Sequence, residues 1–235
     1  MKIIISPSKT QSFDESKVNK VLTTPLLKKQ SDELRNILCG YTKEELGHIL
    51  KIKSKLLDQV YEAYHSNDEK KGAAIEVYTG AVFQQLQVDS YRGMAYDYLK
   101  DHLFILSALY GILKPFDWIE PYRLDMGHRI LNETLYEFWK NELDKVLKDE
   151  EVIINLASNE FSRLIKQPMV TINFKELRDG QYKLIGTYAK IARGKILHYM
   201  ISENIKELED IKGFQGEGYK FNKELSTDQE FIFTR

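Results

Sequence analysis

The chain has 235 residues, with 34 Lys or Arg and 35 Asp or Glu, which give a formal net charge of −1 at pH 7. This balance excludes a protein that coats nucleic acid as a uniform polycation. A hydrophobic fraction of 43% with 29% charged residues is typical of a globular protein. The single cysteine excludes an internal disulfide framework and fits a reducing compartment.

The N-terminal residues 1–5 predict a buried strand, because they are rich in β-branched side chains and end before a proline. This run is too short for a signal peptide, and no other apolar run reaches the length that spans a bilayer. We therefore expect a soluble, cytoplasmic protein with no membrane partner.

Two helices are predicted next, over residues 24–38 and 42–64. Thr24 is suited to cap the first helix and is followed by a proline at the first helical position. A Thr-Lys-Glu-Glu capping box begins the second helix, whose apolar residues keep helical spacing. We expect the two helices to pack as a hairpin, followed by a polar loop over residues 65–72.

Shorter elements are predicted over the rest of the chain. In order, they are a strand over 74–78, a helix over 90–100, an apolar run over 103–106 that is strand or helix, a helix over 133–148, a strand over 152–156, a helix over 159–166, a hairpin of 170–174 with 182–187, a helix over 189–204 and edge strands over 219–221 and 230–233. We find no internal repeat and no linker. The pattern predicts one domain over residues 1–235, of α+β (mixed α/β) class, with a mixed sheet flanked by helices.

The charges are unevenly distributed along the chain. Residues 161–200 contain eight Lys or Arg and two acids, a net charge of +6, whereas residues 131–160 contain eight acids and three lysines, a net charge of −5. If these cations lie together in the fold, they form one basic surface on a neutral protein. Such a surface is typical of a protein that binds a phosphate-bearing partner. If the cations scatter over solvated faces, the asymmetry has no functional meaning.

The histidines and the cysteine are not spaced as in known metal-binding motifs. The five histidines form no His-x-x-x-His pair, and Cys39 has no Cys-x-x-Cys partner. We expect no metal site and no cofactor. Cys39 ends an apolar helix face and is interpreted as a small buried residue.

Polar residues follow both of the strongest predicted strands. Ser6, Ser8, Lys9 and Thr10 follow the first strand and are the residue types that hold phosphate or another anion, although the glycines of a Walker loop are missing. Ordinary turn residues have the same composition. Ser158, after the strand over 152–156, either caps the next helix or belongs to a site at the strand ends.

Two features near the middle of the chain also have alternative interpretations. Residues 109–113, Leu-Tyr-Gly-Ile-Leu, are similar to the hydrophobic hairpin that presents backbone N–H groups to a DNA phosphate, and equally to a turn between core elements. Arg123 and Asp125 share one side of the chain if the segment is a strand. They form either a structural ion pair or a clamp on substrate.

The helix predicted over residues 189–204 carries Lys190, Arg193 and Lys195 near its beginning. Cations at that end oppose the helix dipole, which favours anions there. Lys190 and Arg193 lie on the flank away from the apolar face, about 60° apart. This placement indicates a nearby anion, such as a phosphate.

The chain resembles the YaaA family of bacterial peroxide-stress resistance proteins. The segments that carry the resemblance, in family order, are Ile5–Thr10, Val77–Gly80, Leu106–Pro115, Pro121–Gly127, Ile154–Ser158, Ala192–Gly194 and Gly218–Tyr219. They extend over essentially the whole chain. Ala108 stands where the family usually has a second glycine, and Lys114 stands where it usually has an arginine.

This resemblance implies a single α/β domain of unusual topology with a positively charged cleft. It further implies binding to duplex, bent or branched DNA through a helix–hairpin–helix-like element, and a role in limiting peroxide damage linked to iron. By position, the candidates for DNA contact are Lys9, Lys114, Arg123, Lys190, Arg193 and Lys195. The resemblance supplies no catalytic residue and no obligate protein partner.

Two functions from different classes follow from these observations. The first is a DNA-binding stress protein that neutralises phosphates with little reading of base sequence. The alternative is an enzyme that acts on a nucleotide or another small anion, in a pocket lined by Ser6, Lys9, Arg123 and Asp125. A long basic groove favours the first, whereas a closed pocket favours the second.

Overall fold

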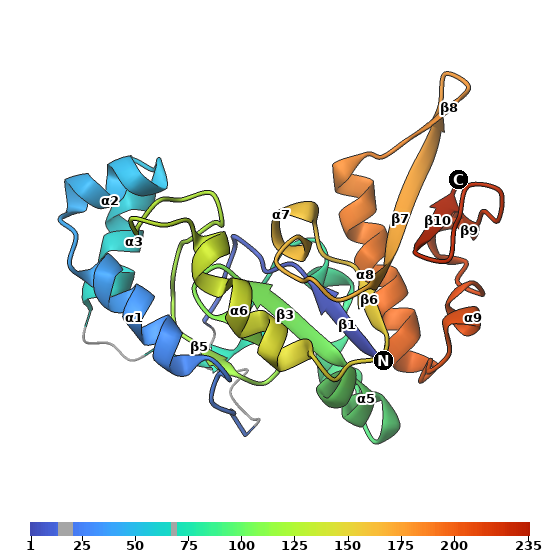
Figure 1. Cartoon of the computed structure of the whole chain (residues 1–235), viewed down its shortest axis with the longest axis horizontal. Helices are drawn as coiled ribbons and strands as arrows, with labels where there is room; N and C mark the ends of the chain where they lie inside the picture. The colour runs from blue at the N-terminus through green and yellow to red at the C-terminus, as the bar shows by residue number, and fades with distance from the viewer. Residues whose placement is uncertain (14–20, 67–69) are drawn as a thin grey trace.

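A mixed β-sheet forms the centre of the protein (Figure 1). The computed structural model describes residues 1–13, 21–66 and 70–235. Within these ranges eight strands form the sheet, in the order β4-β3-β1-β6-β7-β10-β9, and β8 pairs with β7. Their bounds are β1 Lys2–Ile5, β3 Leu103–Ser107, β4 Gly111–Leu113, β6 Ile153–Asn155, β7 Met169–Arg178, β8 Gln181–Lys183, β9 Lys220–Phe221 and β10 Glu230–Thr234.

The central strands are parallel, and the antiparallel pairs lie at the margins. Strand β1 pairs in parallel with both β3 and β6, β6 pairs with β7, and β7 pairs with β10. Parallel strands are usually covered on both faces, and Ile3, Ile4 and Ile5 of β1 are fully buried. The predicted mixed α/β class, with a mixed sheet flanked by helices, is confirmed.

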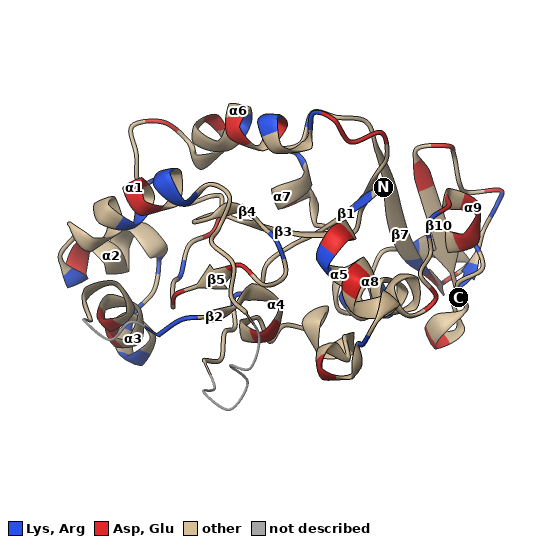
Figure 2. Cartoon of the chain, turned by 90° about the horizontal axis from the view of Figure 1, so that it is seen from below, with Lys and Arg blue, Asp and Glu red and all other residues tan. Residues whose placement is uncertain are grey.

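Helices cover both faces of the sheet. Helix α6 (Leu135–Leu147) packs on one face, and α5 (Met94–His102) and α8 (Gly186–Ser202) pack on the other (Figure 2). Helices α1 (Lys28–Cys39), α2 (Lys43–Leu50) and α3 (Ser54–His65) gather at the end of the molecule opposite to β9 and β10 (Figure 1). The shorter elements are α4 Ala74–Val77, α7 Asn159–Ser162, α9 Leu208–Ile211, η2 Phe83–Gln85, η3 Val88–Ser90, η4 Gly216–Gly218 and the two-stranded sheet of β2 Gly72–Ala73 with β5 Trp118–Ile119.

The helix predicted over residues 42–64 is in fact two helices. The capping box is confirmed, because the Thr42 hydroxyl accepts the Glu45 N–H and the Glu45 carboxylate accepts the Thr42 N–H. Helix α2 then ends at Lys51, which has a φ of 54°, and α3 begins at Ser54. The apolar spacing continues across the break because α2 and α3 pack on each other. Residues 67–69 of the loop predicted over 65–72 lie outside the described residues.

Several boundaries differ from the prediction for local reasons. The strand predicted over 74–78 is the short helix α4, because β2 ends at Ala73 and the N–H groups of Ala74 and Ile75 bond to carbonyls of Asp117 and Pro115. The run over 103–106 is a strand, β3. The prediction of an edge strand over 230–233 is wrong, because β10 pairs with β7 on one side and with β9 on the other.

The hydrophobic turn over residues 109–113 is part of the core. It joins β3 to β4, and its residues are buried. The N–H groups of Leu109 and Tyr110 bond to the Ser107 hydroxyl, and the Ile112 N–H bonds to the Tyr110 carbonyl. The interpretation as a helix–hairpin–helix-like DNA contact is therefore wrong for this segment, since these buried N–H groups already have partners.

We predict that Gly111→Ala destabilises the protein more than Gly180→Ala. Both glycines have a positive φ, of 69° and 75°, but a Cβ at Gly111 lies 2.8 Å from the Trp139 ring, whereas a Cβ at Gly180 has no neighbour within 4 Å. Backbone strain costs about 1–2 kcal/mol at each position, and overpacking adds about 1–3 kcal/mol at Gly111. Urea denaturation measures the free energy of unfolding of both variants. If the two variants lose the same stability, the close contact with Trp139 is contradicted.

Candidate functional site

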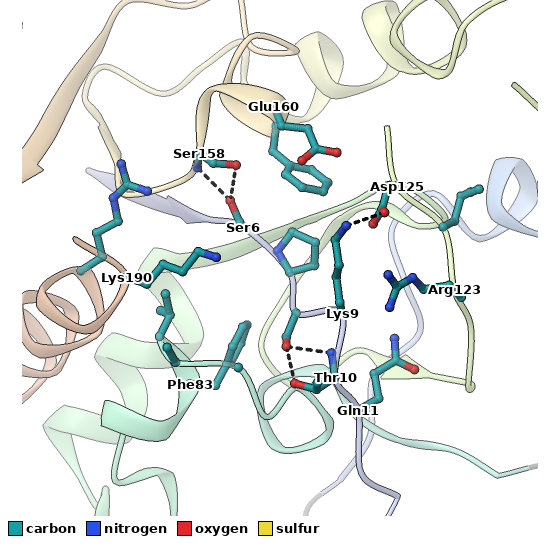
Figure 3. A pocket seen from close by; sticks show the side chains of 18 of the residues that line it. Ser6, Lys9, Thr10, Gln11, Phe83, Arg123, Asp125, Ser158, Glu160 and Lys190 are labelled. Atoms are coloured by element: carbon teal, nitrogen blue, oxygen red, sulfur yellow. Dashed lines mark hydrogen bonds and ion pairs between the residues drawn. The ribbon is translucent and has the colours of Figure 1, made fainter. Parts of the chain in front are cut away.

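Segments that are far apart in the sequence meet in one pocket of about 300 Å³ (Figure 3). It is lined by residues of the ranges 6–11, 80–83, 122–125 and 156–161 and by Lys190 and Arg193 of α8. Strands β1 and β6 are parallel neighbours, so the loops that follow them leave the same edge of the sheet. The pocket therefore lies where parallel α/β sheets usually bind ligands.

Two serines join the loops that follow β1 and β6. The Ser6 hydroxyl donates to the Ser158 hydroxyl at 3.1 Å, and the Ser158 N–H donates to the Ser6 hydroxyl at 2.8 Å. Ser8 and Thr10 bond to each other in the same way, with 2.9 Å between their hydroxyl oxygens. These bonds fix the hydroxyl groups that line the pocket. Figure 3 shows Ser6 between the two loops.

A close backbone approach brings the 80–83 segment against the first loop. A Cβ at Gly80 would lie 2.5 Å from the Ser8 hydroxyl oxygen, so only glycine fits there without a shift. Helix α8 approaches the same segment closely, because a Cβ at Gly194 would lie 2.4 Å from the Val82 carbonyl oxygen. This contact brings the neighbouring residues of α8, Lys190 and Arg193, to the pocket.

The segment over 122–125 is held by buried tyrosines. The Tyr122 hydroxyl bonds to Tyr78 at 2.7 Å and to Ser107 at 2.9 Å. Burial raises the pKa of Tyr122 to about 12, so its hydroxyl stays neutral. The Tyr64 hydroxyl donates to the Arg123 carbonyl and accepts the Arg123 N–H. The backbone that carries Arg123 is therefore fixed on both sides.

Asp125 is bound by two groups. Lys9 Nζ lies 2.7 Å from Asp125 Oδ2, and the Asp125 N–H donates to His128 Nδ1 at 3.0 Å. Burial lowers the pKa of His128, and the Asp125 carboxylate opposes this shift. Since Nδ1 accepts a hydrogen bond, the neutral ring carries its proton on Nε2. The Asp125 carboxylate thus pairs with Lys9 and not with Arg123.

Three cations of the pocket have no carboxylate partner within the described residues. The Nε atoms of Arg123 and Arg193 are both buried without a hydrogen-bond partner, and Lys190 makes no ion pair in the same ranges. Arg193 has one long hydrogen bond, of 3.4 Å, from Nη2 to Asn173. Burial lowers the pKa of Arg193, as expected for a cation with no charge beside it.

The structure brings together most of the residues that the sequence singled out. Those that line the pocket are Ser6, Ser8, Lys9, Thr10, Arg123, Asp125, Lys190 and Arg193. Lys114 and Lys195 do not line it; Lys195 lies 3.8 Å from Glu217 in an ion pair. Helix α8 begins at Gly186, three residues before the predicted start, so Lys190 and Arg193 lie beyond the first turn where the dipole acts.

Sequence reasoning missed Glu160, Gln11 and the apolar side chains of the pocket, Phe83 and Phe161. Each lies inside or within three residues of a segment that carried the family resemblance, and this proximity was the available signal. The basic stretch over 161–200 is partly neutralised by ion pairs. Four of its cations, Lys166, Arg178, Lys183 and Lys195, pair with carboxylates.

Over residues 1–13, 21–66 and 70–235, no group of three or more His, Cys, Asp or Glu side chains is placed to hold a metal ion. Among the described helices, none is long and apolar enough to span a bilayer. The Cys39 thiol donates to the Tyr64 carbonyl, and burial raises its pKa.

The fold and the pocket define a class: a mixed α/β protein with a cation-rich pocket at the ends of its parallel strands. Residues 1–225 match the family described as peroxide stress protein YaaA, and the chain belongs to this family. A UPF0246 protein of Fusobacterium nucleatum is 40% identical, with 100% of this chain and 99% of the relative covered. UPF0246 proteins of Crocosphaera subtropica and Francisella philomiragia are 35% and 36% identical over the full length of both chains.

We predict that protonation of His128 destabilises the protein as the pH falls. Its pKa in the folded state is below the ordinary value of 6.5, so the stability it contributes is present above pH 6.5 and is lost as the pH decreases through the folded pKa. His128→Asn keeps an acceptor for the Asp125 N–H but does not titrate. Between pH 7.5, 6.5 and 5.5, the free energy of unfolding should decrease more steeply for the wild type than for His128→Asn. If it decreases equally for both proteins, protonation of His128 has no such effect.

Proposed function

We propose that this protein acts in the response to peroxide stress by binding a phosphate-bearing ligand in the pocket. One observation carries the proposal: Arg123 and Arg193 line the same pocket, and both have a buried Nε without a partner in the described residues. Burying a guanidinium without a counter-charge is costly, and a bound anion would offset that cost. The family's name supports the link to peroxide stress.

The chemistry of the pocket fits a phosphate group. Arginine donates paired N–H groups that match phosphate oxygens, and lysine adds a point charge. Lys9, Arg123, Lys190 and Arg193 face two carboxylates, those of Asp125 and Glu160, so the lining carries a net charge of +2. This charge equals that of a phosphate dianion in magnitude.

The size of the pocket favours a small anion over a long nucleic-acid groove. About 300 Å³ is at the lower end of the range for small-molecule sites. Acidic and basic residues alternate along α1, α5 and α6 rather than forming a basic face (Figure 2). Of the two functions that the sequence left open, the pocket therefore supports the small anionic ligand better than extended contact with DNA.

DNA binding is a second candidate, and one observation favours it. The side chain of Lys9 is 60% exposed and Lys190 is exposed, so both can reach phosphates outside the pocket. With Arg123 and Arg193 they give about four phosphate contacts, and each contributes about −0.9 to the slope of log K against log salt. DNA whose phosphates reach all four cations of the pocket is therefore predicted to give a slope near −4.

We predict that Arg193→Met weakens binding of pyrophosphate or of DNA about tenfold to hundredfold, because a charge-assisted hydrogen bond contributes about 1.5–3 kcal/mol. The ligand-free protein should melt at the same or a higher temperature, because a buried, uncompensated charge is removed. Calorimetric titration and thermal melting measure the two effects.

Lys195→Met is the matched control, since Lys195 lies on the same helix but outside the pocket and pairs with Glu217. It should leave both affinities unchanged. A lower melting temperature for Arg193→Met with unchanged affinity would show a structural role and overturn the proposal. A slope of log K against log salt near −4 that becomes shallower when either pocket arginine is replaced would favour the DNA candidate over the small ligand.

A further inference from the structure

The pocket has two chemically different sides. In Figure 3, Lys190 lies on one side, and Arg123, Asp125 and Gln11 lie on the other. The first side belongs to α8 and carries only cations, Lys190 and Arg193. The second side combines a donor, Arg123, with an acceptor, Asp125. A ligand that fills the pocket therefore needs a strongly anionic end and a mixed polar end.

The mixed side fits the edge of a nucleobase better than a second phosphate. Arg123 only donates hydrogen bonds, Asp125 only accepts them, and the Gln11 amide does both. Gln11 Oε1 accepts the Tyr122 N–H at 3.2 Å, which leaves the Gln11 NH₂ as a donor. The edge of a base presents donors and acceptors side by side. Because Lys9 Nζ binds Asp125 Oδ2, the second oxygen of this carboxylate, Oδ1, is the acceptor that remains for a base.

The lining of the pocket also includes apolar side chains. Pro7, Val82, Phe83, Leu156 and Phe161 contribute to the wall. Flat aromatic bases stack on aromatic and apolar side chains, and such stacking is tolerant of base identity. An inorganic phosphate fills only a small part of about 300 Å³. The apolar side chains can therefore pack against the ligand if it carries a ring between its two polar ends.

We infer that the pocket holds one nucleoside monophosphate unit, with its phosphate at Lys190 and Arg193 and the edge of its base at Arg123, Asp125 and Gln11. This inference rests on the proposed function and specifies its ligand. The unit is either a free nucleotide or an unpaired nucleotide of a DNA strand, because both present the same phosphate and base. A paired base cannot enter, because its Watson–Crick edge is bonded to its partner and its ring is stacked within the duplex.

The experiment is a calorimetric titration of the wild-type protein with matched ligands: inorganic phosphate, ribose 5-phosphate, the four nucleoside monophosphates, a nucleoside triphosphate and a nucleoside. At least one monophosphate should bind tenfold or more tightly than ribose 5-phosphate, the triphosphate and the nucleoside. Equal affinity of ribose 5-phosphate and the monophosphates overturns the inference but leaves the proposed function standing. If no phosphate-bearing ligand binds, both fail.

Asp125→Asn tests the orientation. It should reduce the affinity for the preferred monophosphate at least fivefold and leave the affinity for ribose 5-phosphate within twofold, whereas Arg193→Met should weaken both. Asp144→Asn is the matched control, since Asp144 pairs with Lys166 outside the pocket. Equal effects of Asp125→Asn on both ligands would place the base elsewhere and overturn the assignment. Oligonucleotides with an unpaired bubble, compared with a full duplex, distinguish a DNA source from a free nucleotide.

Discussion

The parallel pairing of β1 with β6 is the constraint on which the pocket depends. Ile3 lies opposite Ile154 and Ile4 opposite Asn155, so both strands end at one edge of the sheet. The Ser6 and Ser158 hydroxyls then meet directly beyond that edge. A shift of this register by one residue would turn the side chains to opposite faces and separate the serines. Ile3, Ile4 and Ile5 are all fully buried, so β1 is enclosed on both faces of the sheet.

The pocket is positively charged because other cations of the same region pair with carboxylates, whereas its own Lys190 and Arg193 do not within the described residues. The acidic stretch over 131–160 supplies Asp144 to Lys166, and Glu217 from the C-terminal region pairs with Lys195. Lys190 and Arg193 have no such partner in the described residues. Helix α8 holds them at the pocket through its close contact at Gly194, which leaves no room for a side chain that could separate the helix from Val82. The packing of the helix thus maintains an electrostatically costly arrangement.

Local signals in the sequence predicted the pieces of the pocket but not its assembly. The strand ends, the polar loop at Ser6 and the capping box at Thr42 depend on neighbouring residues, and those predictions need no tertiary information. The strand predicted over 74–78 failed because backbone carbonyls of Asp117 and Pro115 accept its N–H groups, a contact across forty residues. The net charge of residues 161–200 left two alternatives open, a basic surface or scattered charges, partly because Lys166 and Lys195 pair with carboxylates that are distant in sequence.

The burial of the Gly111 turn decides which surfaces can meet a phosphate. Its N–H groups bond within the core, so a DNA backbone cannot approach them. Arg193 is also largely enclosed, and a phosphate reaches its guanidinium only by entering the pocket. A duplex that stays on the surface would contact the exposed Lys9 and Lys190, whereas the buried Nε atoms of Arg123 and Arg193 would be reached only by a phosphate that enters the pocket. The proposed ligand, or the part of it that binds these arginines, must therefore be small enough to enter the pocket.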